Sequence, residues 1–500
     1  MGKIKLVDVS IRDGNQSLWG AMQMRTAQDL AVAPIMDRVG FHAVDFTSST
    51  FMSIAVRYHR EDPWERIRLM SAAMPETPLQ FITTGMRFIA WEAADFDFMR
   101  LVYRCLVRNG IRRFIMLDPM HDERALLESA RIMKEEGASE VMAALTYTIS
   151  QVHDDKFYAD LAATCAASPH FDRLYIKDPA GILTPERART LIPAVKNRID
   201  GKPLELHSHC TIGLSVFNYL VGADLGIDVL HTAVGPLANG SSLPSATRLV
   251  ANLREHGHEV DVDDHALQRM TEYFTELAEA EDLPFGTPQE YDASFLRHQM
   301  AGGTLSTTRR QLAEVGLEHR MQDVIEEAER VRAELGYPIM VTPFPQMVSA
   351  QALCNIAGTE RYGQVPDEVI RYVLGRFGRP TAPVDKDVEA RILDRPRAKE
   401  IALESPHLTL GELRRRFGTN LSDEEFLLRA VMSSQLIDDM KAAAPSAYHY
   451  NPLVRKITKA LLALPRESGA ESVAIERPGL KLKLRKKSNG GVEANGGKPS

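Results

Sequence analysis

Residues 173–210 read RLYIKDPAGILTPERARTLIPAVKNRIDGKPLELHSHC, and this segment is the best guide to the architecture of the chain. Two short apolar runs, RLYIK and LELHSH, enclose a stretch with helical periodicity. A strand, a helix and a second strand in this order form a βαβ unit of a parallel sheet. The first predicted strand ends at Lys177 and the second at His207 and His209, which are side chains suited to chemistry.

The same alternation extends from residue 4 to about residue 257. Eight strands are predicted, each followed by a helical segment, and they begin at Ile4, Phe41, Leu79, Arg112, Glu140, Arg173, Leu204 and Val229. No GxGxxG follows the first strand, which disfavours an open doubly wound sheet. We therefore predict an α/β fold of the TIM (β/α)8 barrel type.

Polar or titratable side chains stand at or just beyond the ends of these strands. They are Asp13, Asp45, Thr84, Asp118, Tyr147, Lys177, His209 and Asn239. Because the loops at the carboxyl ends of the strands of such a barrel converge on one rim, this is where the active site is expected.

The length of 500 residues exceeds that of one ordinary domain. Beyond about residue 260 the pattern is helical, and the final SNGGVEANGGKPS is polar and Gly-rich. We predict a metal-binding barrel over residues 1–285, a helical domain over 286–470 that completes the site, and a short strand-like segment with a disordered tail over 471–500.

Composition restricts the classes of function. A net charge of -7 argues against a nucleic-acid partner held by bulk electrostatics. Four cysteines without CxxC spacing indicate neither a disulfide framework nor a thiolate zinc site. No apolar run approaches the roughly 18 residues of a membrane span. We expect a cytoplasmic protein with a small-molecule substrate and no membrane span.

His207 and His209 lie two apart on a predicted strand, so their imidazoles project from the same face, as metal ligands do. Taken alone, such a pair is more often two ordinary histidines, but its position at the carboxyl end of a predicted barrel strand favours the ligand role. Lys177 can be a strand cap paired with Asp178, or, when buried near a metal, a lysine whose carbamate is an oxygen ligand. Asp13 would complete a set of two nitrogen and two oxygen ligands, which suits zinc, manganese or cobalt, and magnesium less well.

The segments DVSIRDGNQS, EDPWERI, YIKDPAGILTP, LHSHCTIG, MAGGT and VTPFPQ together resemble the carboxyltransferase domain of biotin-dependent enzymes. That family includes pyruvate carboxylase, the oxaloacetate decarboxylase α subunit and the transcarboxylase 5S subunit, within the barrel superfamily of hydroxymethylglutaryl-CoA lyase. The similarity is colinear from about residue 4 to about residue 470, and KDxAG followed by HxH thirty residues later is a specific signal.

The resemblance implies roles for individual residues. Asp13, Lys177 as its carbamate, His207 and His209 correspond to the metal ligands. Thr342 matches the threonine that moves a proton between acceptor and biotin. Arg12 and Gln16 match residues that line the acceptor and biotin site; from the residues alone, this loop is equally well a capped helix entry with a local ion pair.

Several positions depart from the family pattern. The RGxN segment, whose arginine binds the carboxylate of pyruvate, reads TGMR here, so that Thr84 replaces the arginine and Arg87 follows three residues later. In addition, WGGAT reads TSSTF, and Asn15 and Cys210 replace a histidine and an aspartate. The expected acceptor is therefore a carbonyl compound other than plain pyruvate, with Arg87 as a candidate substitute for the missing clamp.

The resemblance also implies partners. The biotin attachment sequence AMKM is absent from these residues, as is a biotin carboxylase domain. The chain is expected to receive the carboxyl group from carboxybiotin on a biotin carboxyl carrier protein, to work with a biotin carboxylase subunit and to form a homodimer. The alternatives are a decarboxylase that runs the transfer in reverse, a biotin-independent aldolase or lyase of the same superfamily, and a scaffold subunit without catalysis.

Overall fold

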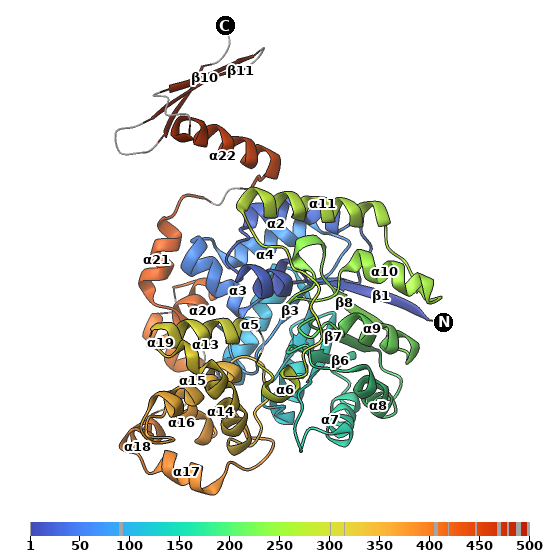
Figure 1. The fold of residues 1–500 in the computed structure, drawn as a ribbon, viewed down its shortest axis with the longest axis vertical. Coiled ribbons are helices and arrows are strands. Elements are labelled where there is room, and N and C mark those ends of the chain that lie inside the picture. Colours follow the sequence, from blue (N-terminus) through green and yellow to red (C-terminus); the bar gives the residue numbers. More distant parts are fainter. Residues whose placement is uncertain are drawn as a thin grey trace.

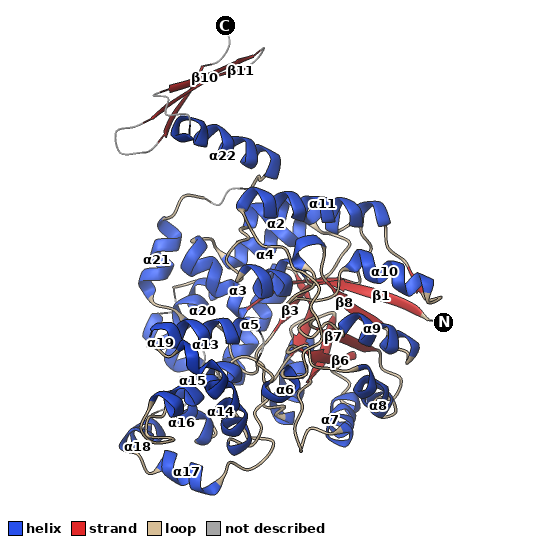
Figure 2. Cartoon of the chain, viewed as in Figure 1, coloured by secondary structure: helices blue, strands red, loops and turns tan. Residues whose placement is uncertain are grey.

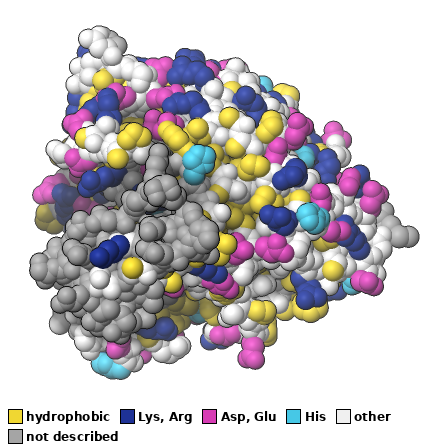
Figure 3. Space-filling model, turned by 90° about the horizontal axis from the view of Figure 1, so that it is seen from above, with side chains coloured by type: hydrophobic (Ala, Val, Ile, Leu, Met, Phe, Trp, Pro, Cys, Tyr) yellow, Lys and Arg dark blue, Asp and Glu magenta, His cyan; other side chains and the backbone are white. Residues whose placement is uncertain are grey.

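The computed structural model describes residues 2–89, 94–300, 302–314, 316–404, 409–418, 420–445, 448–467, 472–477, 480–486 and 492–497. A parallel barrel stands at the centre, with helices around it, a second group of helices beside it, and a C-terminal helix and sheet that project from the body (Figure 1). On the face that Figure 3 shows, basic and acidic side chains are interspersed rather than separated by sign.

The barrel strands are β1 (Lys3–Asp8), β2 (Ala43–Ser48), β3 (Leu79–Ile82), β4 (Ile111–Met116), β5 (Glu140–Thr146), β6 (Arg173–Asp178), β7 (Leu204–Ser208) and β8 (Val229–Thr232). Neighbouring strands are parallel, and β1 pairs with both β2 and β8, which closes the barrel. A short strand, β9 (Glu259–Val260), adds to β1. The eight strands lie at the predicted positions, which confirms the TIM barrel.

Helices cover the outside of the barrel, as the blue ring around the red strands in Figure 2 shows. They are α2 (Thr26–Met36), α4 (Pro63–Ala73), α5 (Phe96–Asn109), α6 (Glu123–Glu135), α7 (Asp155–Ala167), α8 (Pro185–Lys196), α9 (Ser215–Asp224), α10 (Ala246–Glu255) and α11 (Asp264–Glu281). Two short helices, α1 (Asn15–Trp19) and α3 (Ser49–Ile54), stand in the loops after β1 and β2, at the mouth of the barrel. Local sequence places their starts. Thr184, for example, caps α8 by accepting from the amide of Arg187, and Pro185 follows at the first helical position.

The second group of helices has a hydrophobic core of its own, made largely of residues between Met300 and Ile401. It comprises α12 (Phe295–His298), α13 (Gly302–Glu314), α14 (Met321–Glu334), α15 (Phe344–Ala357), α16 (Asp367–Val373), α17 (Lys386–Leu393) and α18 (Pro396–Leu403). Arg332 of α14 fastens this region to the barrel, since it donates to the carbonyl of Ile149 and the hydroxyl of Thr148 at 2.9 Å each.

The C-terminal part packs mainly against the barrel. Helices α19 (Leu410–Phe417), α20 (Asp423–Val431) and α21 (Ser434–Ala442) pack into the barrel core, not into the core of the second helical group. Helix α22 (Pro452–Glu467) lies against α11 and carries an antiparallel sheet of β10 (Ser472–Arg477), β11 (Leu480–Lys486) and β12 (Val492–Gly497). The stretch 492–497 pairs with β11 as an antiparallel strand.

Candidate metal centre and active site

The first loop of the barrel carries Arg12 and Asp13 on a π-helical turn, Ser10–Gly14, that follows β1 directly. Such wide turns are frequent at functional sites because they redirect side chains. Here both side chains are buried, and Arg12 Nη2 lies 2.9 Å from Asp13 Oδ2. Arg12 also donates from Nε to Asp45 Oδ2 of β2 at 2.8 Å, so the guanidinium ties Asp13 to the neighbouring strand.

The two histidines lie side by side at the end of β7, with ring centroids 5.0 Å apart. Nδ1 of His209 lies 2.6 Å from the carbonyl oxygen of Ser241. This contact assigns the ring proton to Nδ1 and leaves the lone pair of Nε2 free to bind a metal ion. The KDPAG loop passes close to this strand at Gly181, which has φ +66 and where a Cβ atom would lie 2.5 Å from the carbonyl oxygen of His209. The glycine of the motif is therefore required by both conformation and space.

Lys177 reaches the same point from β6, where it is in register with His207. Its Nζ lies 3.0 Å from His207 Nε2 and 3.3 Å from Asp13 Oδ2. Pairing with Asp178 does not occur, because Asp178 instead accepts from Ser208 Oγ at 2.7 Å and from two backbone amides of its own loop.

The spacing of these groups fits one metal ion. His207 Nε2 lies 3.3 Å from Asp13 Oδ2, and His209 Nε2 lies 3.6 Å from Asp13 Oδ1. Ligands about 2.1 Å from a tetrahedral ion are roughly 3.4 Å apart, so one ion can contact all three side chains. One ligand atom from each of Asp13, His207 and His209 lies within 4.8 Å of the other two, and all three residues are buried.

The pKa shifts of these side chains also favour metal binding. Burial by itself would raise the pKa of Asp13, but Arg12, Lys177 and His209 outweigh burial and hold that pKa well below its usual value. Burial and the nearby Arg12 lower the pKa of Lys177, an effect that Asp13 partly offsets. Burial and Lys177 lower the pKa of His207. Metal binding requires deprotonated ligands, and these shifts favour them.

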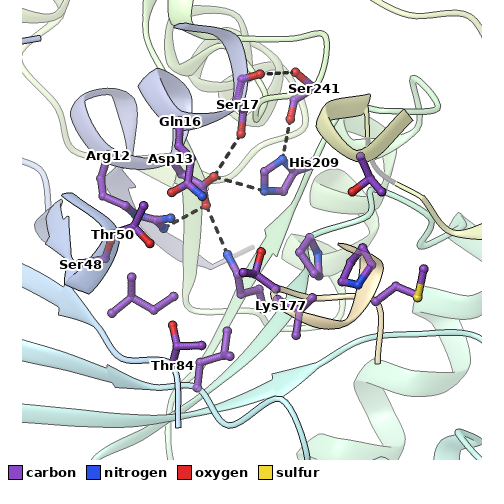
Figure 4. Close-up of a pocket in the computed structure, with 18 of the residues that line it drawn as sticks. Arg12, Asp13, Gln16, Ser17, Ser48, Thr50, Thr84, Lys177, His209 and Ser241 are labelled. Carbon is purple, nitrogen blue, oxygen red and sulfur yellow. Dashed lines mark hydrogen bonds and ion pairs between the residues drawn. The ribbon is translucent and has the colours of Figure 1, made fainter. Parts of the chain in front are cut away.

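A cavity of about 250 Å³ opens above these groups at the carboxyl ends of the strands (Figure 4). The barrel contributes Arg12, Asp13, Gln16, Ser17, Ser48, Thr50, Ile82, Thr83, Thr84, Leu117, Lys177, Pro179, His209 and Ser241. The second helical group contributes Thr304, Met340, Val341, Thr342, Pro345 and Gln346. The cavity therefore lies between the two cores and depends on both.

Most of the residues singled out from the sequence meet here. Asp13, Lys177 and the two histidines converge, and Arg12, Gln16, Thr84 and Thr342 line the same space. Asp118, Tyr147 and Asn239, also at strand ends, are outside the lining set. Sequence reasoning did not single out Ser17 and Ser241, although both stand close to recognised positions; Ser17 donates to Asp13 Oδ1 at 3.2 Å.

Arg87 does not line the cavity. It is buried with its guanidinium 4.6 Å from the ring centroid of Phe377, and it makes no hydrogen bond or ion pair with any described residue. Burial lowers its pKa to about 10. The structure therefore gives Arg87 a stacking contact between the barrel and the second helical group, and not the place of the missing clamp beside Thr84.

The fold and the site define a β/α-barrel enzyme with a candidate metal centre, closed by an appended helical region. A family model described as a conserved carboxylase domain matches residues 295–477. A pyruvate carboxylase subunit of Methanocaldococcus jannaschii is 36% identical over 392 residues, which cover 78% of this chain and 68% of that protein. The 2-oxoglutarate carboxylase large subunit of Hydrogenobacter thermophilus is 30% identical over 463 residues, 90% of this chain and 70% of that one.

The carboxyl transferase domain of Rhizobium etli pyruvate carboxylase, solved with pyruvate, has the same fold, with a TM-score of 0.78 and 20% identity. The match covers 100% of this chain and 88% of that one. The chain belongs to the carboxyltransferase subunits of biotin-dependent carboxylases, which confirms the predicted family and class of enzyme. Enzymes of this family use a divalent metal ion and biotin carried by a partner. In the described part of the chain, no helix has the length and apolarity to cross a membrane.

Proposed function

We propose that Asp13, Lys177 as its carbamate, His207 and His209 hold one divalent ion, and that carboxyl transfer to or from a carbonyl-containing acceptor takes place in the cavity above it. The convergence of these side chains under the Thr342 turn is the observation that carries the proposal. Two neutral nitrogen and two anionic oxygen ligands suit zinc, manganese or cobalt better than magnesium. When bound, such an ion polarises an acceptor carbonyl and stabilises the enolate formed by loss of an adjacent proton.

The protein groups around the ligands keep this arrangement in place. Arg12 holds Asp13 against β2 through Asp45, and the Ser241 carbonyl holds His209 in one orientation. Met340 and Val341 contribute apolar side chains to the cavity wall, which would help to keep water away from a bound acceptor. Gln16 lines the cavity beside Arg12 and is placed to contact the acceptor or the biotin ring.

The acceptor differs from plain pyruvate in the group next to its carbonyl. Among the described lining residues, the basic side chains are Arg12, which already contacts Asp13, and Lys177, which is an anion in the proposed carbamate form. The wall around Thr84 otherwise offers hydroxyl groups, from Ser48, Thr50 and Thr83. A small carboxylate would find no free guanidinium there, whereas a neutral group that accepts or donates hydrogen bonds would be satisfied.

Replacing Thr84 by Arg is expected to create the missing clamp. A charge-assisted, bidentate contact with the substrate contributes roughly 1.5–3 kcal/mol, so kcat/KM for pyruvate should rise about 10–100-fold. Initial rates of biotin-dependent carboxylation of pyruvate, measured with the natural carrier partner, test this. Thr84→Gln, of similar reach but neutral, should give no gain. A wild-type enzyme that already prefers pyruvate, and that the arginine slows, would contradict the proposed acceptor class.

Thr342 is proposed to relay the proton between acceptor and biotin. Thr342 lines the cavity on the wall contributed by the second helical group. Proton transfer by a positioned group contributes about 10²–10⁴-fold, so Thr342→Val should slow carbon dioxide exchange at least about 100-fold while metal content stays unchanged. Thr342→Ser, which keeps the hydroxyl, should retain most of the rate.

Thr304 provides the matched comparison, because it is the other threonine that the second helical group brings to this cavity. Thr304→Val should change the exchange rate far less than Thr342→Val. If the Thr304 variant is slow and the Thr342 variant is unaffected, the assignment of the relay to Thr342 is wrong.

A biotin carboxyl carrier protein and a biotin carboxylase subunit are the proposed partners, and a homodimer is the proposed assembly. Metal analysis, combined with exchange of labelled carbon dioxide in the presence of free biotin and a panel of acceptors, tests the whole proposal. Exchange that requires both metal and biotin supports it, and the acceptor that supports exchange identifies the substrate. Turnover of an acceptor without biotin would instead indicate an aldolase or lyase.

A further inference from the structure

Three ring side chains contact one another inside the barrel, in tilted or edge-to-face arrangements: Tyr175, His231 and the proposed metal ligand His207. Tyr175 precedes Lys177 by two positions on β6, and Glu205 precedes His207 by two on β7, so these pairs share the inner faces of their strands. His231 of β8 is the third ring. The ring centroid of Tyr175 lies 5.6 Å from that of His207 and 4.7 Å from that of His231, and the two imidazoles are 5.4 Å apart.

Charged side chains hold His231, the member of this group on β8. His231 Nε2 lies 2.9 Å from Glu205 Oε2, and the other oxygen of Glu205 contacts the guanidinium of Arg113. Arg113 in turn donates to Gln80 at 2.6 Å and to Glu140 at 2.6 Å, near the bottom of the barrel. A carboxylate on Nε2 assigns the proton of the neutral imidazole to that nitrogen, which makes Nδ1 of His231 an acceptor.

Three polar atoms of the group have no hydrogen-bonding partner among the described residues. They are His207 Nδ1, Tyr175 Oη and His231 Nδ1. All three side chains are fully buried. Leaving one such atom unsatisfied costs about 1–3 kcal/mol, so three of them on rings that contact one another call for a shared partner.

The hydrogen-bonding roles of these three atoms are complementary. When Nε2 of His207 faces the metal, Nδ1 carries the proton and donates. Nδ1 of His231 accepts, and the Tyr175 hydroxyl can do either. A buried water commonly makes about three hydrogen bonds to such groups, and a site with three polar neighbours is the environment in which it is stable.

We propose that one buried water joins His207 Nδ1, Tyr175 Oη and His231 Nδ1, and that Tyr175, His231 and Glu205 are positioning residues for the metal ligand His207. The inference rests on the proposed metal centre. The water would give His207 a hydrogen-bonding partner on Nδ1, the ring nitrogen that does not face the metal, as the Ser241 carbonyl does for His209. Outer partners of this kind fix the ring and its tautomer, and their loss typically weakens metal binding 10–100-fold.

The test uses the full-length protein, stripped of metal and titrated with Zn²⁺ and with Co²⁺ against a coloured chelator. Tyr175→Phe removes one oxygen and keeps the ring, so it should weaken metal binding about 10-fold or more and alter the visible spectrum of the Co²⁺ form. His231→Gln keeps an N–H donor for Glu205, but its acceptor, the amide oxygen, does not stand at the position of Nδ1, so this variant should act in the same direction. The melting temperature of the metal-free Tyr175→Phe protein should change little.

Tyr103→Phe is the matched control, since Tyr103 is a fully buried tyrosine of α5, outside the barrel lumen. It should leave both the affinity and the Co²⁺ spectrum unchanged. Wild-type affinity and an unaltered spectrum in Tyr175→Phe would overturn the inference, as would a high-resolution crystal structure with no ordered water between the three atoms. A wild-type protein that binds no metal would instead overturn the proposed metal centre.

Discussion

Asp13→Asn is expected to abolish stoichiometric metal binding and to reduce carboxyl transfer by at least about 1000-fold. The carboxylate contacts Arg12, Lys177, His207 and His209 together, so the substitution removes the anion that holds the ligand set. Loss of several kcal/mol of enolate stabilisation corresponds to this factor. It also leaves buried cations without their counter-charge, which should lower the free energy of unfolding by about 3 kcal/mol.

The two effects are separated by a control. Asp29→Asn breaks another buried contact with an arginine, Arg66, on the outer helices. It should destabilise the protein comparably in urea unfolding but leave metal content and exchange activity intact. The measurements are elemental analysis, urea unfolding of the metal-free forms and the exchange assay. An Asp13→Asn protein with one tightly bound metal ion would refute the assignment of Asp13.

Lys177→Ala is expected to have the second largest effect, a loss of at least about 100-fold in activity together with most of the bound metal. Burial lowers the pKa of Lys177, which raises the share of neutral amine that can attack carbon dioxide. In that step the N–C bond forms, one C=O π pair moves to oxygen and the amine loses a proton, which gives an anionic oxygen ligand. Without it, Asp13 alone would balance the charge of the ion.

Lys202→Ala is the matched control, because burial also lowers the pKa of Lys202, whose Nζ donates to the carbonyls of Ser168 and Phe171, away from the site. This variant should keep metal and activity. In the wild type, removal of bicarbonate should reduce metal loading, and labelled bicarbonate should give a carbamate carbon signal by NMR that Lys177→Ala lacks. Full metal content and activity in Lys177→Ala would show that no carbamate is needed.

Much of the architecture was predictable from local patterns. Each of the eight barrel strands appears in the sequence as a short apolar run followed by a helical segment, and the structure places all eight where these runs occur. The HxH spacing predicted that His207 and His209 share a face, because strand side chains alternate with a period of two. The strand at 492–497 is not evident from its polar, Gly-rich composition, since strand pairing depends on a free neighbouring edge more than on composition.

The position of the Arg87 side chain was not predictable from local patterns. From the sequence it was a candidate clamp three residues from the expected position, yet it stacks on Phe377, a residue 290 positions away. Ser241 and Thr304 were missed for a related reason, since each reaches the site from a segment far along the chain from Asp13. Ser17 was within reach of sequence reasoning, because it stands four residues after Asp13 and donates to it.

The sequence by itself determined the order of strands and helices, the side of each strand on which Lys177, His207 and His209 project, and the family to which the chain belongs. Only the tertiary structure decided that β1 pairs with β8, which brings Asp13 to these groups, and that the second helical group closes the cavity with Thr342. The reason is physical. Periodicity along a strand follows from local backbone geometry, whereas contacts between remote segments depend on barrel closure, strand register and the packing of separate cores.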